Sequence, residues 1–205
     1  TKHYRARQIV VKMILATLML ATPIINDNNG GQDMSANWDR AKQVAREVRE
    51  KFSNDGSSIN AFEVAKSEGI AIKYFKPKEG DKIAEASGLL NTDGKTIYLN
   101  ITDSPERQNF TLAHELGHYF LKHSPDQYGV YWRNQQYAVG EKTDAEKEAD
   151  CFASELLMPK SLIEKYKKKY HFDDTDYYAL ANLLGVSSEA MKYRLRDIRN
   201  GRVTQ

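Results

Sequence analysis

Two histidines four residues apart, with a glutamate directly after the first, constrain this chain more than any other feature. They are His114, Glu115 and His118, in a largely apolar segment that follows Ser104-Pro105. Serine is a favoured helix N-cap and proline fits the first helical turn, so the sequence predicts a helix from about residue 105 to 122. On a helix, positions four apart are displaced by only about 40°, so both imidazoles face the same way.

This arrangement indicates a metal site. Zn²⁺ favours two imidazole nitrogens plus a carboxylate, and catalytic zinc sites keep one further position open. Glu115 lies one residue after His114, about 100° around the helix, so it is near the open position without competing as a ligand. Zinc lowers the pKa of water toward about 7, and a carboxylate placed there can take its proton. We therefore expect His114 and His118 to be ligands and Glu115 to be the general base.

A third ligand is expected from the helix predicted over residues 143–158. It carries three glutamates, and Glu146 shares a face with Asp150, whereas Glu148 and Glu155 point nearly the opposite way. Glu146 is therefore the candidate ligand. Asp150, one turn later, is the candidate acceptor for the second ring nitrogen of a ligand histidine, a contact that fixes the imidazole.

Three neighbouring features have simpler interpretations. Thr143 and Glu146 also fit a capping box, in which the glutamate only satisfies the helix end. His123 lies about 180° around the predicted helix from His114, so we expect it at the surface. Cys151 is the only cysteine and is expected to pack in the interior. A single cysteine excludes an internal disulfide and a thiolate zinc cluster.

The remaining pattern predicts an α+β fold: a small antiparallel sheet packed against the zinc-binding helix pair, followed by a C-terminal helical subdomain. Helical periodicity and alternating apolar residues locate the other elements, and the Asn91-Thr92-Asp93-Gly94 turn is a strong hairpin signal. The expected elements are helices over 35–52 and 59–68, strands over 70–75, 87–90 and 96–100, and a loop or short hairpin over 124–142.

The chain divides into three parts. Residues 1–33 contain basic side chains followed by a short uncharged run. This run is shorter than the about 20 apolar residues that a membrane-spanning helix needs. We interpret them as an upstream or artificially added extension before a natural start near Met34, with a secretory signal as the alternative. Residues 34–160 are the expected catalytic core, and residues 161–205 the helical subdomain. We expect a cytoplasmic protein, and the net charge of +2 argues against a protein built to coat nucleic acid.

Two longer motifs resemble the ImmA/IrrE family of zinc metallopeptidases. They run from Phe110 to His118 (FTLAHELGH) and from Glu146 to Pro159 (EKEADCFASELLMP), and the segment 86–90 (ASGLL) is also similar. The resemblance covers roughly residues 35–200. It implies a gluzincin-like site that cleaves helix-turn-helix repressors of phage, mobile elements and stress regulons. Carried over, the zinc ligands are His114, His118 and Glu146, the base is Glu115, and Asp150 orients a histidine.

Contacts with the substrate are less well defined by the sequence. A donor is needed for the oxyanion of the tetrahedral intermediate, and the candidates are Tyr128, Tyr131, Tyr137 and His171. Arg107 lies seven residues before His114, hence on the metal face, where it either touches substrate or is simply solvated. The strand over 96–100 either pairs with an extended substrate or is an ordinary internal strand.

A second hypothesis is a DNA-binding transcription regulator in which the zinc site is structural or sensory. Residues 180–187 resemble a helix-turn-helix turn. The following helix carries five cations: Lys192, Arg194, Arg196, Arg199 and Arg202. Against this, the preceding helix has the apolar pattern of a packing element. A helical subdomain that docks on the core or on a repressor is the simpler interpretation of the pattern.

Overall fold

The computed structural model describes residues 36–53, 56–77, 86–91, 95–123, 130–134 and 142–201. The N-terminal extension, Tyr128 and Tyr137 therefore lie outside the described residues. In β4 only the backbone is described.

The described strands form one mixed sheet in the order β1-β3-β2-β4. Strand β2 is antiparallel to β3 and to β4, as the hairpin signal predicts for the first pair. Strand β1 runs parallel to β3, so the prediction of an entirely antiparallel sheet is wrong at this edge. The reason is that β2 reverses the chain direction and β3 reverses it again before β3 pairs with β1. The strands are β1 (Ala71–Phe75), β2 (Ala86–Asn91), β3 (Thr96–Asn100) and β4 (Val130–Asn134).

Strand β3 lies inside the sheet, with β1 on one side and β2 on the other. Its backbone hydrogen-bonding edges are both paired, so it cannot add a substrate strand, and the ordinary internal strand is the correct interpretation. Strand β4 is at the edge, where β2 is its only partner among the described strands.

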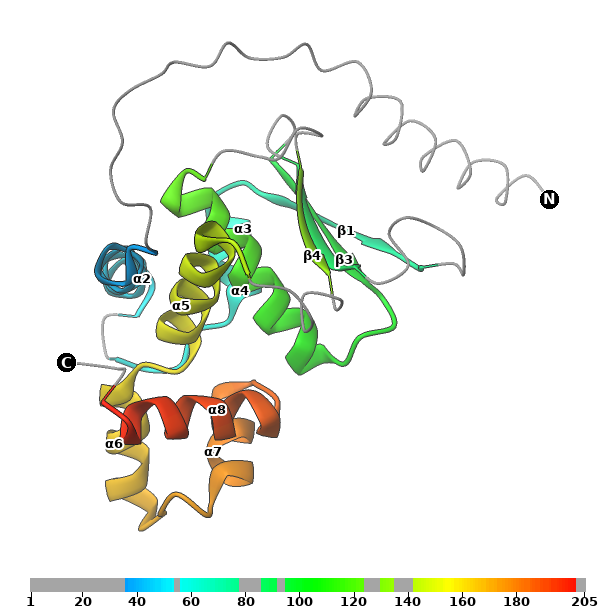
Figure 1. The fold of residues 1–205 in the computed structure, drawn as a ribbon. Coiled ribbons are helices and arrows are strands. Elements are labelled where there is room, and N and C mark those ends of the chain that lie inside the picture. Colours follow the sequence, from blue (N-terminus) through cyan, green and yellow to red (C-terminus); the bar gives the residue numbers. More distant parts are fainter. Residues whose placement is uncertain are drawn as a thin grey trace, which may run out of the picture.

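Helix α4 (Pro105–Leu121) lies at the centre of the fold. Ser104 caps it by accepting a hydrogen bond from the backbone N–H of Arg107, as the sequence predicts. One side of α4 packs on the sheet and on α3 (Ala61–Ser67), and the other packs on α5 (Asp144–Leu157), with α2 (Trp38–Phe52) beyond (Figure 1). The α+β class is thereby confirmed.

Helices α4 and α5 approach each other closely at Gly117. A Cβ at this position would lie 3.0 Å from the Cα and 3.1 Å from the carbonyl oxygen of Ala149, and 3.2 Å from a ring carbon of Phe152. Backbone atoms cannot move aside as a flexible side chain can, so glycine sets the spacing of the two helices. Glycine in a helix interior costs about 1 kcal/mol relative to alanine. The close packing of α4 on α5 offsets this cost.

Replacing Gly117 by valine is therefore expected to destabilise the protein by about 1–3 kcal/mol, the usual cost of overpacking a core. Chemical denaturation of the metal-free protein measures this change. Lys168→Val, at an exposed position of α6 (Lys160–Tyr170), controls for the helix propensity of valine. Equal stability of the Gly117 variant and this control would contradict the close contact.

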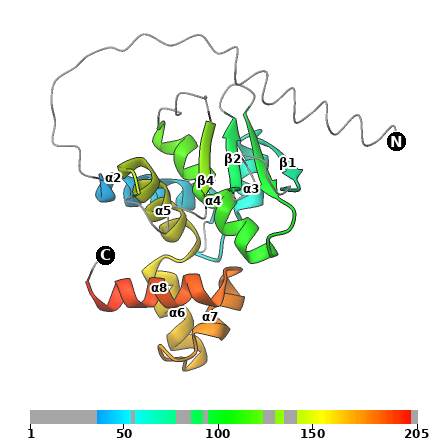
Figure 2. The same ribbon diagram turned by 45° about the vertical axis from the view of Figure 1, so that its right-hand side comes forward.

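Three helices, α6, α7 (Tyr177–Leu184) and α8 (Ser188–Arg199), gather beside the core (Figure 2). Apolar side chains of these helices join the hydrophobic core, and two polar contacts also attach them. Asn109 of α4 donates to the carbonyl of Gly185 and accepts from the backbone N–H of Ala61, both at 3.0 Å. Arg194 of α8 pairs with Glu155 of α5, and both side chains are only 6% exposed. Among the described residues, no helix combines the length and apolar character that crossing a membrane requires. The division at residue 160 stays a prediction.

Candidate metal centre

Three side chains from two helices converge on one point. His114 and His118 lie one turn apart on α4, and their Nε2 atoms are 3.1 Å apart. Glu146, in the first turn of α5, reaches both of them: one carboxylate oxygen is 3.2 Å from Nε2 of His114, and the other is 3.1 Å from Nε2 of His118. The three ligand atoms lie within 4.8 Å of one another, so they can hold one metal ion. The structure thus brings together the three residues predicted as ligands.

Asp150 decides the tautomer of His114. Its Oδ1 lies 2.8 Å from His114 Nδ1, and its other oxygen accepts from the ammonium of Lys142. Because a carboxylate only accepts, Nδ1 of His114 carries a proton, so Nε2, on the side of Glu146, is the nitrogen that can bind a metal ion. The carboxylate of Glu146 beside Nε2 favours a cation between the two atoms, either a proton or a metal ion, so the donor set fits a divalent metal ion.

The protonation states agree with metal binding. Burial, the largest effect, lowers the pKa of His118 to about 4, so its imidazole is neutral at pH 7. Burial alone would raise the pKa of Glu146, but its contacts with both histidines outweigh burial and hold that pKa well below the usual range. Metal binding requires neutral imidazoles and an ionised carboxylate, and His118 and Glu146 have these forms at neutral pH.

Glu146 is at a helix cap but does not complete a capping box. The hydroxyl of Thr143 accepts from the backbone N–H of Glu146 at 3.3 Å, which satisfies one N–H of the helix end. The Glu146 carboxylate, which would have to return to the backbone N–H of Thr143 in a capping box, contacts the two histidines instead. The geometry therefore favours the ligand over the cap.

Glu115 is fully buried between α4 and the sheet. Strand β2 comes so close here that a Cβ on Gly88 would lie 2.4 Å from the methyl group of Thr111 and 3.2 Å from Oε1 of Glu115. The pairing of β2 with β4 also shifts register next to Gly88. Glycine at this position therefore leaves room for the Glu115 carboxylate beside the histidine pair.

His123 is not a surface residue, and this prediction is wrong. Its Nδ1 lies 2.9 Å from Nδ1 of His118, and its Nε2 lies 3.0 Å from a carboxylate oxygen of Glu148. The angle of 180° assumed that the helix continues, whereas α4 ends at Leu121 and Lys122 adopts a left-handed conformation with φ 56°. The chain then turns back, and the backbone N–H of His123 bonds to the carbonyl of His118. No glycine marks this turn, so the turn has little local sequence signal.

Comparison with known protein families gives a match over most of the described core. The model of the IrrE N-terminal-like domain, Peptidase_M78, matches residues 65–196, more than half of the chain. The chain belongs to this family. The resemblance to ImmA/IrrE proteins is therefore confirmed, and the family name implies a metal-dependent peptidase.

Individual relatives are distant. The metallopeptidase ImmA of Bacillus subtilis (strain 168) is 28% identical over 127 residues, which cover 61% of this chain and 69% of that protein. A solved structure described as a Mycobacterium tuberculosis transcriptional regulator has 15% identity and a TM-score of 0.48. That match covers 77% of this chain and 49% of the other, so this chain spans about half the length of the solved protein.

The other predicted site residues of this family member are scattered. Arg107 donates a hydrogen bond to the hydroxyl of Ser87 at 3.1 Å, and its Nε lies 3.4 Å from Oδ2 of Asp103. The Arg107 side chain is still 47% exposed. Tyr131 is in the edge strand β4. His171 is an exposed residue at the C-terminal end of α6, in a left-handed conformation, so its place in the helical group gives no support to an oxyanion role.

Cys151 packs partly buried beside α2, as expected. Its sulfur lies 3.8 Å from the carbonyl of Trp38. Burial raises the pKa of Cys151 to about 11, so the thiol stays protonated at neutral pH. It is neither a metal ligand in the described cluster nor an activated nucleophile.

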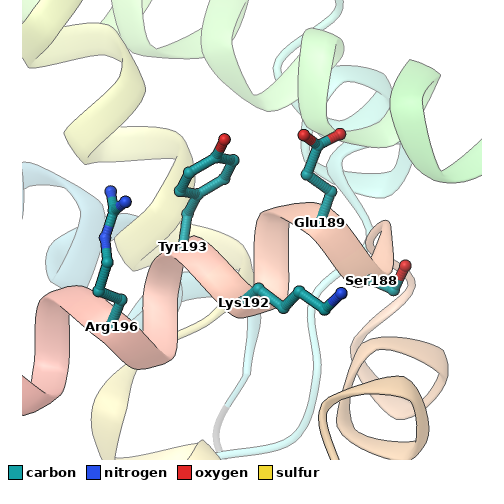
Figure 3. Close-up of a pocket in the computed structure, with 5 residues that line it drawn as sticks. All are labelled: Ser188, Glu189, Lys192, Tyr193 and Arg196. Carbon is teal, nitrogen blue, oxygen red and sulfur yellow. The ribbon is translucent and has the colours of Figure 1, made fainter.

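A groove of about 940 Å³ extends from Asp150 across the surface between the core and α8. Arg107 and Phe110 of α4 line it, as do Cys151 and Ser154 of α5. Helix α8 contributes Glu189, Tyr193 and Arg196, which lie on the side of the helix that faces the core (Figure 3). These three residues, with Ser188 and Lys192, also line a smaller pocket along α8. Sequence reasoning missed this contribution of α8 to the surroundings of the site.

Proposed function

We propose that this chain is a zinc-dependent endopeptidase that cleaves a protein substrate, and that the substrate is a helix-turn-helix transcriptional repressor. One observation is the main support for a peptidase: two buried imidazoles of α4 meet the partly buried carboxylate of Glu146, and the buried Glu115 follows the first histidine on α4. The proposal that the substrate is a repressor rests on the resemblance to ImmA/IrrE proteins.

The ligands would be His114, His118 and Glu146. Zn²⁺ held there would supply Lewis acidity toward the scissile carbonyl and lower the pKa of water. Glu115 accepts the proton of the attacking water at a carboxylate oxygen and gives it to the leaving amide nitrogen. Asp150 holds the ring of His114 in the tautomer that keeps Nε2 available. Burial of Glu115 keeps bulk water from competing for this proton.

The substrate chain is proposed to bind between the edge strand and the groove. Strand β4 replaces β3 in this role, because an edge strand can pair with an extended peptide by backbone hydrogen bonds. The groove beside Asp150 then takes residues further along the substrate, where Arg107 and Tyr193 present exposed polar groups. Tyr131, on β4, stays a candidate donor for the oxyanion.

The regulator hypothesis finds less support. Arg194 is buried, donates to the carbonyl of Met158 at 2.8 Å and pairs with Glu155, so it cannot reach DNA. Arg199 pairs with Asp174 at 2.7 Å. Of the four described cations on α8, Arg194 is thus buried and Arg199 forms a surface ion pair, which argues against α8 as a recognition helix.

Removal of the metal tests the proposal directly. A chelator is expected to abolish cleavage of a purified repressor encoded beside this gene, and added zinc to restore it. Because zinc binds the folded state, free zinc at 100 times its Kd is expected to stabilise the protein by about 2.7 kcal/mol. Elemental analysis, a gel-based cleavage assay and a melting curve measure the three quantities. Cleavage that persists in demonstrably metal-free protein would refute the proposed mechanism.

A further inference from the structure

The second ring nitrogen of His118 contacts another histidine, whereas that of His114 contacts an aspartate. His118 Nδ1 lies 2.9 Å from His123 Nδ1, and the rings meet edge to face with centroids 5.0 Å apart. The turn at Lys122 makes this contact possible, because it folds the chain back over the last turn of α4. His123 therefore occupies the place next to His118 that Asp150 occupies next to His114.

The protons along this contact have only one arrangement compatible with a metal on His118. A ligand imidazole bound through Nε2 carries its proton on Nδ1. Nδ1 of His118 then donates, so Nδ1 of His123 must accept and the proton of His123 must be on Nε2. That Nε2 lies 3.0 Å from Oε2 of Glu148, a carboxylate that accepts it.

The far end of this chain of contacts is anchored. Oε1 of Glu148 accepts from the backbone N–H of Asn37 at 2.7 Å, and Asn37 is the N-cap of α2. The side chains of His123 and Glu148 are 9% and 13% exposed, so water competes little for these hydrogen bonds. The contacts therefore join three separate parts of the chain: the end of α4, the middle of α5 and the start of α2.

From this geometry we infer that His123 and Glu148 form a relay that positions His118 as a metal ligand. The relay consists of the hydrogen bonds His118–His123 and His123–Glu148. It fixes the ring orientation of His118 and keeps its Nε2 lone pair toward Glu146, as Asp150 does for His114. Both residues are positioning residues, since they act through His118 and do not belong to the group of three candidate metal ligands. This inference rests on the proposed metal site, but it does not depend on what the protein cleaves.

The test compares two substitutions of His123. Asparagine places a side-chain oxygen near the position of the histidine Nδ1 and can still accept from His118, whereas leucine fills similar space without an acceptor. His123→Leu is expected to weaken zinc binding by about 10–100-fold, the range typical for lost outer contacts of a ligand histidine. His123→Asn is expected to retain most of the affinity. Competition with a chromophoric zinc chelator measures Kd in each purified full-length variant.

A second substitution tests the other end of the relay. Glu148→Ala is expected to weaken zinc binding in the same direction, and the double variant His123→Leu/Glu148→Ala to lose less than the product of the two single effects, because both act through His118. Glu164→Ala, an exposed glutamate of α6, is the matched control. Melting curves of the zinc-free proteins separate a loss of affinity from a loss of folding, and if the leucine variant fails to fold, Glu148→Ala carries the test.

The outcomes distinguish the relay from the metal site itself. Wild-type affinity in both His123→Leu and Glu148→Ala overturns the relay, as does an asparagine variant as weak as the leucine variant. If the wild-type protein binds no zinc, the relay and the proposed function both fail. If it binds zinc through the relay but cleaves no protein, only the proposed peptidase activity fails.

Discussion

Glu115→Gln is expected to bind zinc as tightly as the wild-type protein and to cleave its substrate about 10²–10⁴-fold more slowly, the range that a general base contributes. Glutamine has the shape of glutamate, so it fits the buried space beside Gly88. It cannot take up the proton of the attacking water. The effect should appear in kcat, and single-turnover cleavage with equal zinc content in both proteins measures it.

Glu50→Gln, on the exposed side of α2, provides the matched control for loss of one carboxylate. It is expected to cleave at the wild-type rate. Should the Glu115 variant cut as fast as this control while holding zinc, Glu115 is not the base, and another group must be sought around the histidine pair.

Glu146→Ala is expected to weaken zinc binding by more than about 100-fold, the largest loss typical for residues that only contact a ligand histidine. Cleavage is expected to be lost as well. The carboxylate is the only one that reaches both Nε2 atoms among the described residues. Without it two neutral imidazoles remain, and these hold a divalent ion weakly. Equilibrium dialysis with metal analysis measures the loss.

Thr143→Ala separates the ligand from the helix cap. The hydroxyl of Thr143 caps α5 through the N–H of Glu146, so its removal is expected to cost about 1 kcal/mol of stability. Zinc affinity should remain close to that of the wild-type protein. The ligand assignment is wrong if the Thr143 and Glu146 variants lose zinc equally.

The metal helices were predictable because their signals are local. The cap at Ser104, the spacing of His114 and His118 and the apolar face of α4 all act within one helix, and the predicted end at residue 122 differs from the observed one by a single residue. Glu146 was predictable from helix geometry together with the ligand preference of zinc. The hairpin signal likewise located β2 and β3, which pair directly.

Features set by distant parts of the chain were not predictable in this way. The parallel pairing of β1 with β3 depends on where two chain reversals bring the strands, and no local pattern records it. Arg194 reads as a surface cation in a basic helix, yet it is buried against Glu155 of α5. His123 was misplaced because a lysine adopts the left-handed conformation that glycine usually marks.

The contact at Gly117 joins the same two helices that carry the histidines and Glu146, so the helix spacing that closes the core also fixes the distances among the ligands. An ion bound there would hold together the same two helices that must separate when the protein unfolds. Loss of the metal would then remove both the catalytic activity and a link between α4 and α5 that stabilises the folded state. In a cell, molecules without metal would be the first to open and be degraded, so the surviving population would be enriched in active enzyme.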